Sequence, residues 1–211
     1  MSYELIETFT KETILYCPVA HHYTTLDGQT LVSGSAYAKQ NTPDFDADKI
    51  AGFVATKLKA RKSDILEMWA MNGDLASKFG TALHLAMEQW FRFRDLGTSK
   101  GYHRPKIRYL LDAVETFPLK EANIVPEAVV SDSVALRCGR LDAIVVNEDC
   151  SLSVLDYKTD ANVEKNLEKH TLQLNFYRAI LEAKGFRVKE MVIWAYDGAW
   201  SAHTLKRKEI L

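Results

Sequence analysis

The chain has 211 residues, of which 47% are hydrophobic, so it is long enough to bury one substantial core. Its 27 basic and 28 acidic residues give a formal net charge of −1, so a polyanion would have to be held by a local basic patch. The three cysteines, Cys17, Cys138 and Cys150, contain no C-x-x-C pair, which argues against a zinc knuckle or a four-cysteine iron–sulfur cluster.

The cysteine content and the distribution of apolar residues indicate the expected cellular compartment. Three scattered cysteines argue against a disulfide framework and favour a reducing environment. Residues 1–20 lack a basic start followed by an apolar block, and no stretch approaches the roughly 20 apolar residues of a membrane span. We therefore expect a soluble, cytoplasmic protein that does not bind a membrane.

The N-terminal part predicts a β-hairpin followed by helices. Residues 21–40 have β-rich flanks around Asp27-Gly28, a dipeptide that favours hairpin turns. Residues 42–79 carry apolar side chains at helical spacing, interrupted at Asn72-Gly73, which predicts two helices. The apolar spacing after Gly80 predicts a third helix from Thr81 to Asp95.

The rest of the chain predicts one helix, three strands, a long helix and a closing hairpin. The helix at 105–118 is bounded by prolines. The strands are "IVPEAVVSD", "VALRCGRLDAIVVNED" and "SLSVLDYKT", and the second helix spans 162–185. The hairpin joins "VKEMVIWAY" to "WSAHTLKR".

This order predicts an α/β (α+β) fold with a central mixed β-sheet flanked by helices. No repeat, low-complexity run or linker divides the chain, so residues 1–211 are expected to form a single domain. Within it, residues 1–79 would form an N-terminal hairpin and helical elaboration, and residues 80–211 the core.

Charged residues gather on the central predicted strands. Because side chains alternate along a strand, Asp156 and Lys158 should share one face. The same alternation would place Arg140, Asp142 and Ile144 together on the preceding strand. If "NEDC" forms the turn between these strands, Asp142 and Asp156 converge on an antiparallel pair.

Two adjacent buried acids cost several kcal/mol, and Lys158 alone cannot neutralise both. Mg²⁺ or Mn²⁺ could do so through oxygen ligands, an arrangement that serves phosphodiester hydrolysis. The alternative is an ordinary ion pair between Asp156 and Lys158, with Asp142 paired to Arg140 or solvated.

Four motifs in order resemble those of the RecB-type nucleases of the PD-(D/E)XK superfamily. They are "GTALH" at 80–84, "GRLDAIV" at 139–145, "VLDYKT" at 154–159 and "QLNFY" at 173–177. The resemblance covers roughly residues 70–200 and is greatest to the phage exonuclease and mitochondrial genome maintenance exonuclease-like proteins. It implies a restriction-endonuclease-like core preceded by a hairpin and a helical region.

The resemblance also implies roles for individual residues. Metal ligation would fall to His84, Asp142, Asp156 and the backbone carbonyl of Tyr157, and catalytic roles to Asp142, Asp156, Lys158, Gln173 and Tyr177. Gln173 and Tyr177 are four residues apart, which places them on one helical face, where they could position Lys158 or a phosphate. Glu127 matches an acid that commonly precedes the central one, with a less fixed role.

One or two Mg²⁺ or Mn²⁺ ions are the implied cofactors, and no iron–sulfur cluster is expected. Absence of the cluster cysteines disfavours the CRISPR-adaptation and helicase–nuclease branches. A zinc hydrolase is disfavoured because H-E-x-x-H is missing. Glu88, one helical turn after His84, is either a further metal or water contact or part of a solvated face.

Several residues are candidates for nucleic-acid contacts. Basic runs at 57–62 and 103–108 could track phosphates or simply form solvated faces. Ser33 and Ser35 could bind a phosphate, although turn and strand chemistry explains them equally well. His170 should share the helical face of Gln173 and could touch the phosphate, but exposure at the surface near the helix start is the expected position. The full set is Ser33, Ser35, Lys57, Lys59, Arg61, Lys62, Arg104, Lys106, Arg108 and His170.

We therefore expect a metal-dependent DNA nuclease, an exonuclease acting on single-stranded DNA or duplex ends in DNA processing, recombination or repair. Its setting would be a bacterial or phage-infected cell, with a recombination or replication protein as partner. One alternative is a catalytically silent nuclease-fold module that binds nucleic acid or a protein. Others are an enzyme that works only inside a larger complex, or one that prefers RNA.

Overall fold

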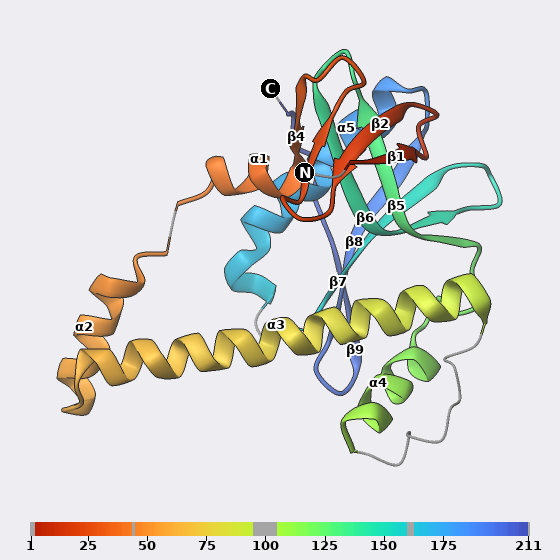
Figure 1. The fold of residues 1–211 in the computed structure, drawn as a ribbon. Helices are drawn as coiled ribbons and strands as arrows, with labels where there is room; N and C mark the ends of the chain where they lie inside the picture. Colours follow the sequence, from red (N-terminus) through yellow and green to blue (C-terminus); the bar gives the residue numbers. More distant parts are fainter. Residues whose placement is uncertain (1–2, 44, 95–104, 160–162, 211) are drawn as a thin grey trace.

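The computed structural model describes residues 3–43, 45–94, 105–159 and 163–210, with the backbone alone at 105–107. These residues form a mixed β-sheet flanked by helices, which confirms the predicted α+β class (Figure 1). The strands are β1 (Glu4–Glu7), β2 (Thr13–Cys17), β3 (His22–Thr24), β4 (Thr30–Ser33), β5 (Ile124–Asp132), β6 (Arg137–Val146), β7 (Leu152–Lys158), β8 (Val188–Tyr196) and β9 (Trp200–Thr204). The helices are α1 (Gly34–Gln40), α2 (Ala47–Leu58), α3 (Lys62–Phe93), α4 (Pro105–Thr116) and α5 (Leu167–Ala183), with a 3₁₀ turn at Val163–Asn166.

Strand β6 is the centre of the sheet. Its partners run in the order β1-β2-β3-β4-β6-β7-β8-β9, with β5 also paired to β6. Cys138 pairs with both β4 and β5, and Ala143 pairs with both β5 and β7. Strands β4 and β7 therefore share one edge of β6, and β5 occupies the other. Between those two partners, β6 leaves a short stretch of its edge open to other groups.

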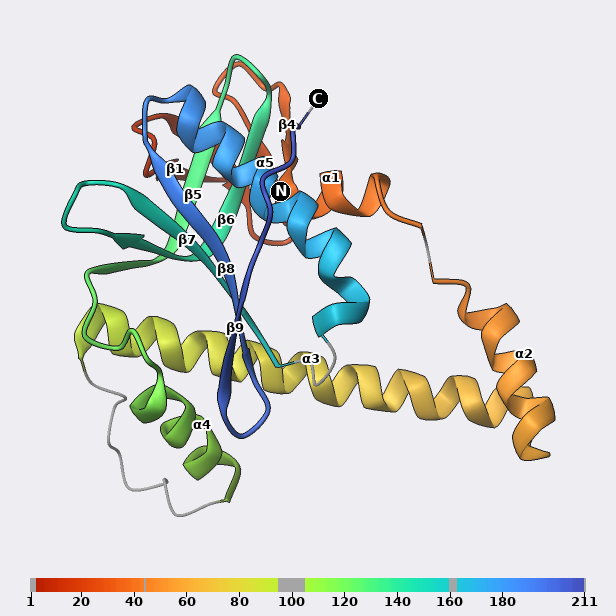
Figure 2. The same ribbon diagram turned by 180° about the vertical axis from the view of Figure 1, so that it is seen from behind.

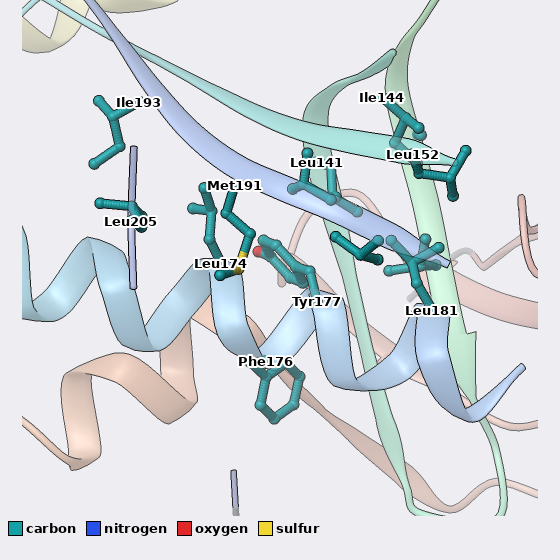
Figure 3. Packing of buried hydrophobic residues seen from close by; sticks show 14 of the residues in the cluster. Leu141, Ile144, Leu152, Leu174, Phe176, Tyr177, Leu181, Met191, Ile193 and Leu205 are labelled. Atoms are coloured by element: carbon teal, nitrogen blue, oxygen red, sulfur yellow. The ribbon is translucent and has the colours of Figure 1, made fainter. Parts of the chain in front are cut away.

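Helices cover both faces of the sheet (Figures 1 and 2). Helix α5 packs on one face, where Leu174, Tyr177 and Leu181 point toward the strands (Figure 3). Phe176 points away from them, and its ring lies 5.0 Å from that of Tyr37 on α1. The other face is covered by α3 and α4, whose buried side chains include Leu83. Burial of apolar side chains in both layers holds the central strands in place.

Helix α3 differs from the prediction. Its 32 residues run without a break through Asn72-Gly73 and Gly80, so the interruption predicted there and the separate helix starting at Thr81 are wrong. The break lies earlier, where Lys59 ends α2 with a left-handed φ of 52°. A glycine inside a helix costs only about 1 kcal/mol relative to alanine, and tertiary packing readily offsets that cost. Helix α3 also runs across the expected boundary between the N-terminal elaboration, which ends at residue 79, and the core, which begins at residue 80. That the chain forms a single domain stays a prediction.

The N-terminal hairpin is confirmed as β3 and β4, which flank Asp27-Gly28. The structure adds β1 and β2 to it, which the sequence reading missed. Residues 34–40, predicted as part of the extended flank, instead form α1. The helix begins there because Ser33 Oγ accepts a hydrogen bond from the backbone N–H of Ala36.

The remaining predicted elements are confirmed with small shifts at their ends. The three central strands appear as β5, β6 and β7, the closing hairpin as β8 and β9, and the bounded helix as α4. The long second helix begins as α5 at Leu167 rather than at 162. No helix in the described parts of the chain combines the length and apolar character that a membrane span requires.

Candidate active site

Three acids form a row across β5, β6 and β7. Ala143 and Leu155 form the last pair of the β6–β7 ladder, and Asp142 and Asp156 are the next residues on the two strands. On the other edge of β6, the pairs flanking Glu127 bring that residue opposite Asp142. Asp142 and Asp156 therefore sit on paired antiparallel strands, as predicted. The sequence reading had not placed Glu127 in the same row.

Regular side-chain alternation fails at the centre of this row. Leu141 and Ile144 belong to the same core layer although they are three residues apart, whereas Ala143 lies in the opposite layer. The prediction that Arg140, Asp142 and Ile144 share one face is therefore wrong. Glu127 adopts a left-handed φ of 49°, so both paired strands are irregular at this position. Strain of this kind is common where a side chain is aimed at a functional site.

The side chain of Asp142 accepts a hydrogen bond at the point where the backbone pairing between β6 and β7 ends. The pairing stops at Ala143 and Leu155, and the backbone N–H of Tyr157 donates instead to Asp142 Oδ2 over 2.7 Å. Burial raises the pKa of Asp142, but the hydrogen bond and charge of His84 outweigh it, so the pKa is lowered. Asp142 is thus held as a carboxylate in a fixed position.

His84 reaches this carboxylate from α3. The buried side chains of Leu83 and Met87 anchor its helical turn against the sheet. His84 Nε2 lies 2.9 Å from the carbonyl oxygen of Tyr157, to which it can only donate, and Nδ1 lies 3.4 Å from Asp142 Oδ1. Burial opposes the charged ring, but the hydrogen bond and charge of Asp142 outweigh it and raise the pKa of His84. A neutral ring with its proton on Nε2 would instead turn its Nδ1 lone pair toward the carboxylate. That arrangement calls for a cation or a proton between the two groups.

Glu127 completes a group of three ligands. One ligand atom each from His84, Glu127 and Asp142 lie within 4.8 Å of one another. Burial and the charge of Asp142 raise the pKa of Glu127 to about 7, although Arg140 partly offsets this. The sequence signal for this residue was its place in "VPEAVV". Only the register shows that it faces Asp142.

The donors of this group fit a divalent cation. Two carboxylates and one imidazole are ligand types that Mn²⁺ accepts, and the carboxylates and nearby Tyr157 carbonyl also suit Mg²⁺. A cation would relieve the repulsion that raises the pKa of Glu127. It would also satisfy the Nδ1 lone pair of His84. The residues present therefore fit the metal that the sequence reading expected, with Glu127 as an additional ligand.

Asp156 and Lys158 share one face of β7, as the alternation predicted. Lys158 Nζ lies 2.6 Å from Asp156 Oδ2, and both side chains are largely buried. Burial raises the pKa of Asp156 to about 6, with Asp142 adding to the shift and Lys158 opposing it. Asp156 lies outside the three-ligand group, so its carboxylate is held by lysine in this structure. Its role as a ligand stays a prediction.

Gln173 and Tyr177 lie together on α5, and Gln173 Nε2 donates to Tyr177 Oη over 3.3 Å. The Tyr177 ring is buried against Gly34 and Gly139, where an added Cβ would come within 2.5 Å and 2.2 Å of its Cε1 atom. The absence of side chains on these two glycines lets the Tyr177 ring pack closely on the face of β4 and β6. Tyr177 thereby supports the strand that carries Asp142.

His170 is buried with 8% of its surface exposed, so the expected surface position is wrong. Among the described residues, neither of its ring nitrogens has a hydrogen-bond partner. Burial, with Lys158 and Lys169 nearby, lowers its pKa to about 4. The neutral form that results leaves His170 poorly suited to attract phosphate by charge.

Of the other nucleic-acid candidates, none of the described ones belongs to the three-ligand group. The basic run at 57–62 occupies the α2–α3 connection, at the end of α3 that projects beyond the sheet (Figure 1). Within it, Arg61 pairs with Asp64 and Lys62 with Asp48. Ser33 caps α1 and lies 3.1 Å from Ser35 Oγ. Arg108 is exposed on α4, whereas Arg104 and the side chain of Lys106 lie outside the described residues.

An open groove of about 680 Å³ runs along α3 to the ligands. One wall consists of small α3 residues, and the inner end reaches His84, Glu127 and the Tyr157–Thr159 segment of β7. The small wall residues are Gly73, Ala76, Ser77, Gly80 and Thr81. The groove therefore gives a large, polar substrate access to the buried charges.

The sheet, its flanking helices and this site define a restriction-endonuclease-like α+β protein. Residues 110–207 match the model of the PD-(D/E)XK nuclease superfamily, which supports assigning the core to that superfamily and indicates a metal-dependent nuclease. The matched segment contains Glu127, Asp142, Asp156, Lys158, Gln173 and Tyr177, and His84 precedes it.

No curated protein matches the chain significantly. Among solved structures, the chain is similar to one titled "Crystal structure of SSO0001", with 16% identity and a TM-score of 0.34. That similarity covers 62% of this chain and 68% of the other.

Proposed function

We propose that the protein is a divalent-metal-dependent deoxyribonuclease that removes nucleotides from DNA ends. The observation that carries the proposal is the group formed by His84, Glu127 and Asp142 at the inner end of an open groove. The Asp156–Lys158 pair lies beside it on the neighbouring strand. Clustered carboxylates would repel phosphate unless a cation is present, so a purely binding role gains nothing from them.

His84, Glu127 and Asp142 would hold Mg²⁺ or Mn²⁺, with the Tyr157 carbonyl close by. When bound, such an ion polarises a phosphoryl oxygen and lowers the pKa of a water molecule. Lys158 would turn from Asp156 to the phosphate and stabilise the charge that develops during in-line attack. Asp156, released from Lys158, would then be available as the second acid.

Gln173 and Tyr177 would position these groups rather than contact the reacting atoms. Tyr177 packs on Gly139 of β6, the strand that carries Asp142, and Gln173 donates a hydrogen bond to its hydroxyl. The finer features of the proposal extend the RecB-type resemblance: action from an end, a phage or bacterial setting, and a role in recombination or repair. They also include a cytoplasmic location and a replication or recombination partner.

The decisive experiment offers the protein linear duplex, circular duplex and single-stranded DNA with Mn²⁺, labelling each end in turn. We expect degradation of linear substrates, sparing of the circle and no reaction in EDTA. Asp156→Ala and Lys158→Ala should abolish degradation, whereas Arg187→Ala, at an exposed ion pair with Asp149, should retain it.

Degradation that persists in both variants, or no metal-dependent degradation by the wild-type protein, would contradict the proposal. Nucleic-acid binding that survives EDTA without any cleavage would instead support a silent nuclease-fold module. Parallel reactions with RNA of the same sequence test the assignment to DNA.

A further inference from the structure

A second groove adjoins the first on the other side of the acidic row. It has a volume of about 620 Å³ and lies between the N-terminal segment around Lys11, α3, and strands β5 and β6. Glu88 and Glu127 line both grooves. The two grooves therefore meet at Glu127, which is also one of the three candidate metal ligands.

The grooves differ in the cations that line them. Among the described residues that line the first groove, Lys158 is the only lysine or arginine. Lys11, Arg92 and Arg140 line the second groove. Arginine presents a planar set of donors that matches the geometry of phosphate oxygens. Glu7, Glu88 and Glu127 also line the second groove, but its two arginines supply anion-binding donors that the described lining of the first groove does not have.

Both arginines are available to an incoming phosphate. Arg92 pairs with Glu88 one helical turn away at 2.7 Å, and 46% of its side chain is exposed. Exposed pairs of this kind contribute little, so Arg92 can change partner readily. Arg140 lies 3.8 Å from Glu127, which is beyond hydrogen-bond reach. Its guanidinium also lies over the Tyr16 ring at 5.5 Å, which fixes its direction.

We propose that the second groove binds phosphates of the nucleic-acid strand on one side of the scissile bond, through Arg92 and Arg140. This inference rests on the proposed nuclease function, since it places the strand across the ligand group. The strand would run from the small-residue wall of α3, over Glu88 and Glu127, into the arginine groove. If Glu127 held a metal ion, its attraction on Arg140 would weaken, and Arg140 would meet phosphate from its position over the Tyr16 ring.

The test measures binding rather than turnover. A fluorescent single-stranded oligonucleotide is titrated with wild-type protein, Arg92→Ala and Arg92→Ala/Arg140→Ala, in EDTA and separately with Ca²⁺, over a range of salt concentrations. For single strands, each phosphate contact contributes about 0.7 to the slope of log K against log salt. We expect the slope to fall by about 0.7 in the single variant and by about 1.4 in the double variant.

Two further variants keep the result interpretable. Arg187→Ala is the matched control, because Arg187 is an exposed arginine paired with Asp149 on the far side of the β6–β7 turn. It should leave the slope unchanged. Arg92→Lys/Arg140→Lys keeps both charges and should restore most of the slope, which would not happen if the alanine variants were merely misfolded.

The outcomes separate this inference from the proposed function. Wild-type protein that binds with these slopes but never cleaves would sustain the phosphate groove and refute the nuclease. Wild-type protein that cleaves while the alanine variants keep the wild-type slope would refute the groove alone. Failure of the wild-type protein to bind in both EDTA and Ca²⁺ would overturn the phosphate groove.

Discussion

Two clusters of charged side chains tie the sheet to its surroundings, one around Glu12 and one around Asp142. Glu12 accepts hydrogen bonds from Ser131 and Ser133 and lies 2.6 Å from Lys184 Nζ. Burial opposes ionisation, but these partners outweigh it and lower the pKa of Glu12 to about 2. This cluster joins the β1–β2 connection, the β5–β6 turn and the end of α5 with its acid fully satisfied.

The cluster around Asp142 has similar residue types but the opposite electrostatics. Glu127 and Asp156 both have raised pKa values, about 7 and about 6, because burial and nearby carboxylates outweigh their basic partners. Left-handed backbone occurs in both clusters, at Glu127 in one and at Lys11 and Leu136 in the other, so the contrast between them is electrostatic. A cluster optimised for folding satisfies its charges, whereas this one retains a demand for positive charge. That difference favours a binding role for it.

The strongest test of this contrast is Asp142→Asn. It removes a central ligand charge while keeping the shape of the side chain, so we expect metal-dependent DNA degradation to fall by more than about 100-fold. Initial rates with end-labelled linear DNA and Mn²⁺ provide the measurement. Glu12→Gln is the matched control and should keep its rate per folded molecule. Equal losses in the two variants would show that the clusters do not differ in function.

Glu127→Gln should show the demand for positive charge as a stability effect. An acid whose folded pKa lies above its unfolded value destabilises the fold as pH rises from about 4.5 to about 7. The metal-free variant should therefore gain about 1–3 kcal/mol over the wild type at pH 8 and little at pH 4. Urea unfolding at both pH values measures this gain.

A second measurement on the same variant compares its unfolding temperature with and without Mn²⁺. Wild-type protein should unfold at a higher temperature when the ion is added, and Glu127→Gln should respond less because it loses a ligand. Identical pH profiles and identical Mn²⁺ shifts in the two proteins would remove Glu127 from the site.

Glu12→Gln should produce the smallest effect and the opposite dependence on pH. A lowered folded pKa stabilises the fold above about 4.5, and this contribution disappears as pH falls toward about 2. We expect the variant to lose about 1–2 kcal/mol at pH 7, measured by urea unfolding. Glu164→Gln, at an exposed position, should change nothing. A loss that persists unchanged at pH 2.5 would contradict the electrostatic explanation.

The sequence predicted those parts of the fold that depend on local pattern. Strands β5 to β7 follow from runs of valine and isoleucine, and the shared face of Asp156 and Lys158 follows from alternation. Helix α3 was predicted in pieces because Gly73 and Gly80 are weak helix formers. Their cost is small beside the packing of the same helix on the sheet, and local sequence does not report that packing.

The parts of the site that the sequence missed depend on register. The place of Glu127 opposite Asp142, and the loss of alternation at that pair, arise where two distant strands meet. The burial of His170 likewise reflects how α5 packs on the sheet. These features become visible only when segments far apart in the chain are brought together. The position of Asp142 beside Asp156 could be predicted because a short turn joins their strands.

The spread of the three ligands along the chain has a consequence for the newly made protein. His84 belongs to α3, Glu127 to β5 and Asp142 to β6, so no short fragment contains the whole group. The three residues come together only where α3 packs on the sheet. A chain that is still emerging or only partly folded would therefore lack the complete group.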